Sequence, residues 1–173
     1  GSSAFHSCSG LQSITIPNGV ISIRDSTFRS CSGLKNITIP NGVISICDYT
    51  FLSCSSSKSI IIPDGVTSIG CYAFRLCTAL QCISIPESVK FIGYSVFSSC
   101  SRLKNISIPD GLISIDGNAF RECSELQSIK FPKKAQSIEY STFYRCSSLQ
   151  SINIPENVAS IGNYAFYYCK NLQ

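Results

Sequence analysis

Cysteine is the residue in this chain with the greatest capacity for chemistry, because a thiol can form a disulfide, bind a metal ion or act as a nucleophile. The chain has 11 cysteines and a single histidine among 173 residues. Most of the cysteines recur at an interval of 23 residues: Cys8, Cys31, Cys54, Cys77, Cys100, Cys123, Cys146 and Cys169. The remaining three lie outside this series: Cys47, Cys71 and Cys82.

The regular interval favours buried, unpaired thiols over disulfides or a zinc site. Cysteines stacked in one column would lie about 5 Å apart and point the same way, whereas a disulfide needs Cβ atoms about 3.8 Å apart and a dihedral angle near 90°. No Cys-x-x-Cys pair is present, so the ligand spacing of a zinc site is missing. Because a free cysteine packs like a small hydrophobic residue, we predict a column of unreactive thiols.

We expect different chemistry from the three cysteines outside the column. Cys82 aligns with Ser13 and Asn36 at an outward strand position, so we predict that it is an exposed, reactive thiol. Cys47 and Cys71 are one unit plus one residue apart, which leaves a diagonal disulfide between them as an alternative. Many free thiols favour a reducing compartment.

Other residues that could support catalysis or metal binding are sparse. His6 is the only histidine, and we expect it to be exposed. Four carboxylates share one column and could in principle bind Ca²⁺: Asp64, Glu87, Asp110 and Glu156. Asn18, Asn41 and Lys133 occupy the same column, which favours solvated turn residues instead. No nucleophile elbow or phosphate-binding loop is present, so we predict a chain that is not an enzyme and needs no cofactor or metal.

The interval of the cysteines extends to two other residue types and therefore describes the whole chain. Phenylalanine recurs at Phe5, Phe28, Phe51, Phe74, Phe97, Phe120, Phe143 and Phe166. Every proline follows the same rule: Pro17, Pro40, Pro63, Pro86, Pro109, Pro132 and Pro155. Such a fixed period is typical of a solenoid. We predict one array over residues 1–173, with about seven and a half units, and we expect it to be part of a longer protein because neither end has a polar capping unit.

Each unit has the pattern of one coil. Residues 11–16 end in alternating apolar and polar positions, which predicts a short, half-buried strand that Pro17 terminates. A turn and a second short strand follow, as in residues 20–23. Residues 72–77 are too few for a free-standing helix, and we predict a helical or 3₁₀ turn. Strands of successive coils would pair in parallel, about 4.8 Å apart.

Departures from the pattern indicate a packed interior. Ser57 stands where the other units have leucine, which predicts a polar hole and makes this coil the least stable. Phe131 replaces an isoleucine and Ala135 a valine, an exchange that conserves volume.

The outward strand positions are the candidate ligand-binding face. One column carries amides and amines: Gln12, Lys35, Lys58, Gln81, Lys104, Gln127 and Gln150, with Lys130 in a neighbouring column. This face is polar, mildly basic and nearly free of acid, and it suits a glycan or an acidic protein patch. Few aromatic residues lie there and the net charge is only +4, which disfavours nucleic acid. A solvated face without a ligand is the alternative. Arginine recurs in every second unit on another face, at Arg29, Arg75 and Arg121. These arginines could form a basic binding stripe, or they could serve only to keep the protein soluble.

The segments 13–17, 66–70 and 164–169 resemble the BspA-like class of leucine-rich repeats, and the resemblance extends over essentially the whole chain. It implies a right-handed leucine-rich-repeat coil with a parallel sheet on the concave face, short second strands, and short helical or 3₁₀ turns elsewhere. It also implies a secreted or cell-surface location, which competes with the reducing compartment that the free thiols favour. The family has no catalytic motif.

Two functions follow from this resemblance and from the outward columns. The first is an adhesion module that binds a host or cell-surface protein or glycan, and the alternative is a structural spacer without a ligand. Unpaired strand groups at the two ends predict end-to-end association of copies. No segment is long and apolar enough to span a membrane. Asn36 and Asn105 begin glycosylation acceptor patterns, which are open alternatives.

Overall fold

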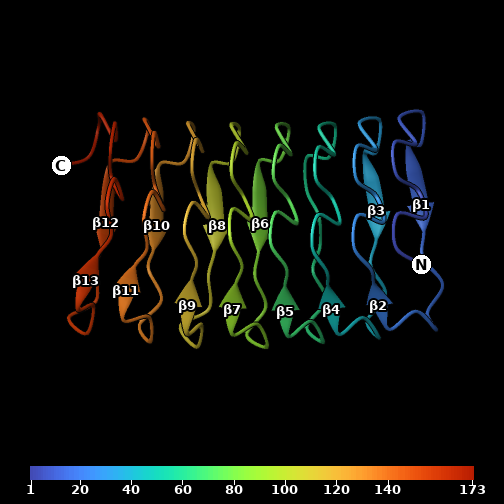
Figure 1. Ribbon diagram of the computed structural model, residues 1–173, viewed down its shortest axis with the longest axis horizontal. Coiled ribbons are helices and arrows are strands. Elements are labelled where there is room, and N and C mark those ends of the chain that lie inside the picture. Colours follow the sequence, from blue (N-terminus) through green and yellow to red (C-terminus); the bar gives the residue numbers. More distant parts are fainter.

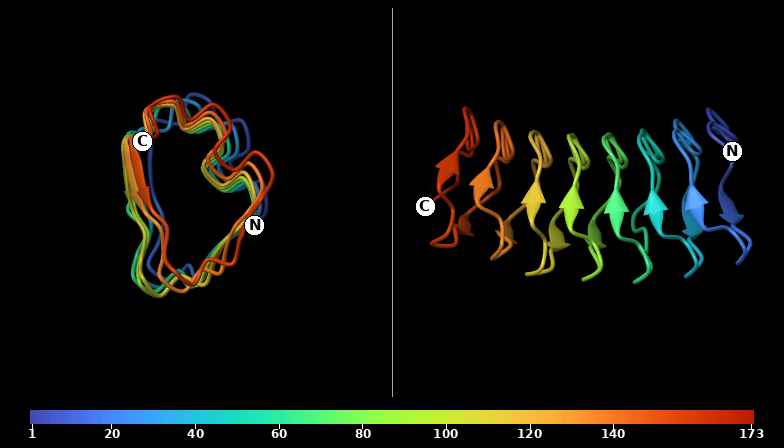
Figure 2. Two further views of the ribbon diagram at one scale, coloured as in Figure 1. Left: turned by 90° about the vertical axis from the view of Figure 1, so that its left-hand side faces the viewer. Right: turned by 60° about the horizontal axis from the view of Figure 1, so that its bottom comes forward.

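The computed structural model describes residues 1–173, which form a solenoid of stacked coils (Figure 1). Seen along its axis, the coils superpose around one shared interior, and the two termini lie at opposite ends of the stack (Figure 2). The predicted parallel repeat solenoid is confirmed. The structure contains no helix of the length and apolar character that a membrane crossing requires.

Each coil contributes up to two very short strands. The three-residue strands are β1 (Ser13–Thr15), β3 (Asn36–Thr38), β6 (Cys82–Ser84), β8 (Asn105–Ser107), β10 (Ser128–Lys130) and β12 (Ser151–Asn153). The two-residue strands are β2 (Ser22–Ile23), β4 (Ser45–Ile46), β5 (Ser68–Ile69), β7 (Phe91–Ile92), β9 (Ser114–Ile115), β11 (Ser137–Ile138) and β13 (Ser160–Ile161).

All strand pairs are parallel, and they join residues one unit apart, as Ser13 with Asn36. The two-residue strands form a sheet in the order β2-β4-β5-β7-β9 and a second pair, β11-β13. The three-residue strands form the pairs β1-β3, β6-β8 and β10-β12. These strands are shorter than predicted, because the residue at the start of each expected strand belongs to a turn: the Leu34 N–H donates to the Cys31 carbonyl of its own coil (3.0 Å).

A ladder of phenylalanine rings runs through the interior. Successive rings from Phe5 to Phe166 are stacked, with centroids 5.3–5.6 Å apart and planes within 9° of parallel. The ladder belongs to one continuous core of 41 buried residues. Phe131 and Ala135 are both buried in it, as the volume-conserving exchange predicted. Identical side chains of successive coils therefore lie on one another.

The segment expected to be a helical or 3₁₀ turn is instead a run of β-turns, and no helix is present. The i to i+3 hydrogen bonds of a 3₁₀ turn exist, as from the Arg75 N–H to the Tyr72 carbonyl (3.1 Å). However, Tyr72 and Leu76 have positive φ angles of 58° and 61°. Because the backbone changes conformation at these residues, every second N–H of the segment points toward the next coil, and the Phe74 N–H donates to the Val96 carbonyl at 3.0 Å. A helix would have kept those N–H groups within its own coil.

The coil with Ser57 is distorted, but the predicted polar hole is wrong. Ser57 is fully buried, and its hydroxyl donates to the Leu34 carbonyl of the preceding coil (2.6 Å). Its neighbours 59–61 form no strand, and only an isolated bridge joins Ser59 to Cys82. The serine thus satisfies its own polar group while the adjacent sheet is interrupted. That this coil is the least stable remains a prediction.

The positive φ angle of Leu76 gives a direct test of the turn geometry. A side chain in this left-handed conformation costs about 1–2 kcal/mol, and a β-branched one costs more. Leu76→Ala and Leu76→Gly both remove the partly exposed leucine side chain, but only glycine also relieves the left-handed conformation. Leu76→Gly should therefore have a free energy of unfolding about 0.5 kcal/mol higher than Leu76→Ala, after the greater freedom of glycine in the unfolded chain is subtracted. Urea denaturation of the two variants measures the difference, and a less stable glycine variant would contradict this backbone conformation.

Candidate binding surfaces

The predicted ligand-binding residues lie together on the face that carries the three-residue strands, which we call the long-strand surface. All eight are exposed: Gln12, Lys35, Lys58, Gln81, Lys104, Gln127, Lys130 and Gln150. Seven of them immediately precede a three-residue strand or the Ser59 bridge, and Lys130 ends β10. Backbone hydrogen bonds link neighbours in this column, as from Lys104 to the Gln81 carbonyl (3.0 Å). The structure therefore brings the predicted column onto one surface.

The long-strand surface is less basic than the sequence predicts, because acidic residues from other columns reach it. The Lys130 ammonium lies 2.8 Å from an Asp110 carboxylate oxygen, and Lys133 pairs with the same carboxylate at 3.4 Å. The hydrogen bond from Lys130 is the main reason that the pKa of Asp110 lies below its usual value. Lys104 lies 3.7 Å from Glu125. The expectation of a face nearly free of acid is therefore wrong in this half of the chain.

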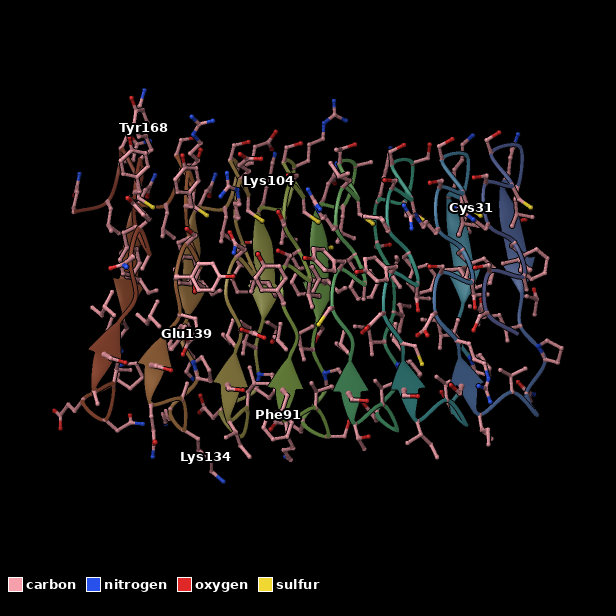
Figure 3. The ribbon with its side chains drawn as sticks, in the orientation of Figure 1. Cys31, Phe91, Lys104, Lys134, Glu139 and Tyr168 are labelled. Carbon is pink, nitrogen blue, oxygen red and sulfur yellow. The ribbon has the colours of Figure 1, made fainter.

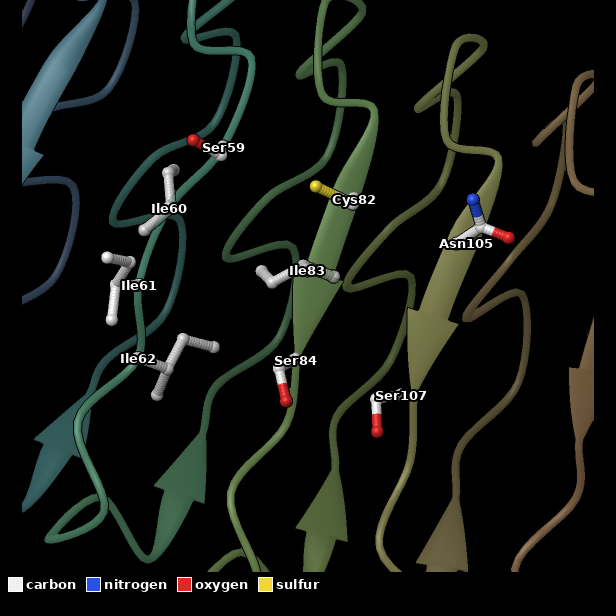
Figure 4. Close-up of a pocket in the computed structure, with 9 residues that line it drawn as sticks. All are labelled: Ser59, Ile60, Ile61, Ile62, Cys82, Ile83, Ser84, Asn105 and Ser107. Atoms are coloured by element: carbon white, nitrogen blue, oxygen red, sulfur yellow. The ribbon is translucent and has the colours of Figure 1, made fainter.

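Lys35 and Lys58 differ from these lysines, since neither forms an ion pair. Beside Lys58, an open hollow of about 350 Å³ lies where the sheet is interrupted (Figure 4). Residues 59–62 form one wall, and the opposite wall comes from β6 with Cys82 and from β8. Ile61 is 80% exposed at this point. The sequence contained a signal for the hollow, because Ile61 is the one large apolar residue in an otherwise polar column.

The column cysteines have a structural role that the sequence analysis did not predict. Each column thiol except that of Cys8 donates a hydrogen bond to the carbonyl of the phenylalanine 26 residues earlier in the chain, as from Cys100 Sγ to the Phe74 oxygen (3.1 Å). The same contact recurs from Cys31 to Cys169 at 3.0–3.2 Å. Figure 3 shows the sulfur atoms as a row along the solenoid. A cysteine fits here because it is a small apolar residue with a weak donor.

Burial also controls the chemistry of these thiols. Desolvation raises the pKa of Cys100 to about 12, and it raises the pKa values of Cys77, Cys123 and Cys146 well above the usual 9.0. The thiolate is the reactive form of cysteine. These side chains therefore remain protonated and unreactive at neutral pH.

None of the cysteines outside the column is fully buried, and within the column Cys8 is exposed because it lies in the first coil. Cys82 is an exposed free thiol at the start of β6, as predicted. Cys47 and Cys71 are partly buried free thiols, so the alternative of a disulfide between them is wrong. Cys47 Sγ lies instead 3.7 Å from the hydroxyl of Ser22 and 3.9 Å from that of Ser45.

The remaining candidates for chemistry are dispersed. His6 is exposed, as expected. Of the carboxylate column, Asp64, Glu87 and Glu156 are exposed, and Asp110 is half-buried in its ion pairs. No group of three or more histidine, cysteine or acidic side chains is arranged to hold a metal ion.

A second surface, rich in tyrosine and arginine, was missed by the sequence analysis. Tyr49 and Tyr72 stack with their centroids 5.0 Å apart, and Tyr94 packs edge-on to Tyr72 at 5.3 Å. Arg75 lies over the Tyr72 ring at 5.6 Å, and Arg121 over another tyrosine at 4.3 Å. The predicted arginine stripe is thus part of an aromatic surface. The available signal was the number of tyrosines, 8 in all.

Comparison with known proteins places this geometry among leucine-rich repeats. The family model described as BspA type leucine rich repeat region, in 6 copies, matches residues 1–101 and 45–173. Among solved structures, the leucine-rich repeat protein of T. pallidum is 30% identical, with a TM-score of 0.89 over 93% of this chain and 78% of that one. No curated protein has a significantly similar sequence.

Two larger bacterial proteins contain similar arrays. A leucine-rich repeat protein from Eubacterium ventriosum is 29% identical, with a TM-score of 0.77 over 91% of this chain and 42% of that one. A leucine-rich cell surface protein from Faecalibacterium prausnitzii is 32% identical, with a TM-score of 0.62 over 98% of this chain and 54% of that one. The chain therefore spans about half the length of these two proteins.

The buried thiols predict a loss of stability at alkaline pH. Because the pKa of Cys100 rises from 9.0 to about 12 on folding, the folded chain keeps a proton that the unfolded chain releases. This contribution is fully present below about pH 9 and is lost as the pH rises toward 12, by about 1.4 kcal/mol per pH unit for each such thiol. Urea denaturation between pH 7 and pH 11 measures how the free energy of unfolding changes with pH. In Cys100→Ser the decrease above about pH 9 should be smaller by the contribution of one thiol, and an unchanged decrease would show that Cys100 has no raised pKa in the folded chain.

Accessibility predicts which thiols react first. Brief treatment of the native protein with iodoacetamide should alkylate the exposed Cys82 before the buried Cys77 and Cys100. The buried thiols must wait for local opening, which should slow them by about a hundredfold or more. Peptide mass spectrometry measures the order, and Cys82→Ser serves as the control that removes the fast label at this position while the exposed Cys8 keeps its own. Equal rates at all three positions would show that the core is not closed.

Proposed function

The chain belongs to the BspA-type leucine-rich repeat family, and we propose that it is a non-catalytic adhesion module whose long-strand surface binds a host or cell-surface protein or glycan. Proteins with this type of repeat are often surface or adhesion proteins and are generally non-catalytic. A secreted or cell-surface location is part of the proposal. The similar F. prausnitzii protein is described as a cell surface protein, which supports it.

The observation that carries the proposal is the apolar hollow that begins at Ser59, with Lys58 directly before it in the chain and Lys35 one coil further away, both without ion pairs. Lys35 and Lys58 occupy adjacent coils, so their ammonium groups can approach the same anionic patch. Ile61 presents an apolar side chain that is 80% exposed beside the hollow. Burying such a side chain against a partner stabilises a complex by about 1.5–3 kcal/mol, and the two charges add attraction that depends on salt. Apolar contact and unpaired charge thus lie on neighbouring coils of one surface.

The alternative function is a spacer, and the ion pairs at the other end of the same surface favour it. Lys104 and Lys130 are engaged with Glu125 and Asp110, which leaves little unpaired charge there. Continuous stacking of the phenylalanine ladder makes the array a semi-rigid rod that extends by about 4.8 Å per coil. A rod of this kind can hold other domains away from a surface without binding anything itself.

End-to-end association of copies is a further proposal about partners. Beside the first coil lies an open, mainly apolar hollow of about 270 Å³, lined in part by Phe5, Val20 and Phe28. Another coil stacked on this end would fill the hollow with its own apolar side chains. The hollow supports the proposal, which light scattering across a concentration series would test.

Charge reversal on the long-strand surface separates adhesion from spacing. The double variant Lys35→Glu, Lys58→Glu should reduce attachment of the labelled protein to cultured epithelial cells and to immobilised heparin by about tenfold or more, since attraction becomes repulsion. The matched control is Lys90→Glu, Lys134→Glu, which makes the same change in net charge at two exposed positions outside this surface, one directly before β7 and one in a turn. The control should attach like the native protein.

The outcomes discriminate between the two functions. Equal attachment by the double variant and the native protein would place the binding site elsewhere. Failure of the native protein to attach to either target would contradict the adhesion module and leave the spacer. Circular dichroism should show both variants folded, because the substituted side chains are exposed.

A further inference from the structure

The tyrosine–arginine surface consists of Tyr49, Tyr72, Arg75, Tyr94, Arg121 and Tyr144. All six side chains are exposed or half-buried, and they come from the run of β-turns and not from the long-strand surface. The rings and guanidinium groups hold one another in place, since Arg75 lies 5.6 Å from the Tyr72 centroid and Arg121 lies 4.3 Å from that of Tyr144. Tyrosine and arginine are the residues most enriched in the centres of protein interfaces.

A small residue in one column opens a hollow in this surface. The position that follows each core phenylalanine carries a long side chain in most coils, such as Arg75, Arg121 and Tyr144, but it carries Ser98 in the coil between the two arginines. The result is an open hollow of about 310 Å³ with Arg75 on one side and Arg121 on the other. At about 4.8 Å per coil, these two coils are about 10 Å apart, so groups from both can reach a ligand between them.

The floor of the hollow is polar. Ser95, Ser98 and Asn118 line it and are nearly buried, with exposures of 3–4%. Asn118 donates from its amide to the Tyr94 hydroxyl at 3.0 Å, which holds the amide and the ring together. Hydroxyl and amide groups on a closely packed backbone provide hydrogen bonds of fixed direction to a polar ligand.

The charge of the hollow is positive. Arg75 forms no ion pair, and the carboxylate that lies closest to Arg121 belongs to Glu122, at 3.7 Å. Glu122 is also shared with Arg145 at 4.0 Å and accepts a hydrogen bond from Ser99 at 3.0 Å. The charged side chains that line the hollow are Arg75, Arg121 and Glu122, which leaves one net positive charge there, and Arg145 lies beyond them on the other side of Glu122. The complementary ligand group is an anion.

The packing of the rings decides the class of partner. Tyr72 is stacked on Tyr49 with planes 6° apart and is covered on its other side by Tyr94. Its faces are therefore unavailable for a nucleobase, which single-stranded nucleic acid recognition would require. The rest of the surface offers guanidinium groups, which bind carboxylates in a bidentate fork, and polar hydroxyl and amide groups. This combination fits the acidic side chains of a protein.

We propose that the tyrosine–arginine surface is a second binding site, which takes a carboxylate side chain of an acidic protein segment into the hollow between Arg75 and Arg121. The site is independent of the long-strand surface and of the partner proposed for it. A neighbouring acidic residue of the same segment would contact Arg145, on the far side of Glu122. The tyrosine rings provide a rigid platform that loses little entropy on binding.

A fluorescein-labelled oligoglutamate peptide tests the proposal by fluorescence anisotropy with the full chain. We expect saturable binding in the micromolar range that weakens as salt is added. The decisive variant is Ser98→Tyr, which fills the hollow without changing the net charge. It should fold, because Tyr144 and Tyr167 occupy the same column in other coils. Binding should fall by about tenfold or more, as it should in Arg75→Ala, Arg121→Ala.

Matched controls distinguish this site from general attraction to a basic protein. The variant Arg24→Ala, Arg102→Ala removes the same charge from exposed positions outside the hollow and should bind like the native chain. The variant Lys35→Glu, Lys58→Glu should also retain binding, whatever becomes of the adhesion proposal. Native affinity in Ser98→Tyr, an equal loss in either control, or no peptide binding would each overturn the inference. Tighter binding of a heparin oligosaccharide or an oligothymidylate in the same hollow would overturn the inference that the partner is a protein.

Discussion

The structure depends on one constraint: each residue lies directly on the residue one unit later in the chain. Hydrogen bonds between coils enforce this register, because the turn segment directs alternate N–H groups to the next coil, as from Phe51 to Ala73 (2.8 Å). Once the register is fixed, side chains of the same type must stack, and the phenylalanine ladder follows. A coil on its own could satisfy neither its backbone groups nor its apolar side chains.

The same constraint explains why cysteine recurs. The close approach of coils leaves space for only a small side chain beside the phenylalanine carbonyl of the preceding coil, and Cys54 fills it with a thiol that donates to Phe28 at 3.1 Å. Alanine would fit but offer no donor, and a larger residue would separate the coils. The thiol is thus a packing and hydrogen-bonding group, and its raised pKa is a consequence of that burial.

Features that obey the period could be predicted from the sequence, and features that join different columns could not. The solenoid, the phenylalanine stack and the exposed long-strand column all lie within the period. Lys130 and Asp110 are 20 residues apart, so an alignment of units places them in separate columns and hides their ion pair. Tyr94 and Tyr140 are likewise displaced by one residue from the column of Tyr72, although Tyr94 packs against both rings. The positive φ angles gave no signal, because serine, leucine and tyrosine adopt them here instead of glycine.

The two proposed binding surfaces arise where single coils depart from the repeat. Ser57 replaces a core leucine, the adjacent sheet is interrupted, and a hollow opens beside Ile61. Ser98 replaces a long side chain on the other surface, and a polar hollow opens between two arginines. In both cases the neighbouring coils keep the register and therefore hold the walls in fixed positions. A repeat array can in this way acquire a binding site through one substitution, since the scaffold around the altered coil is already rigid.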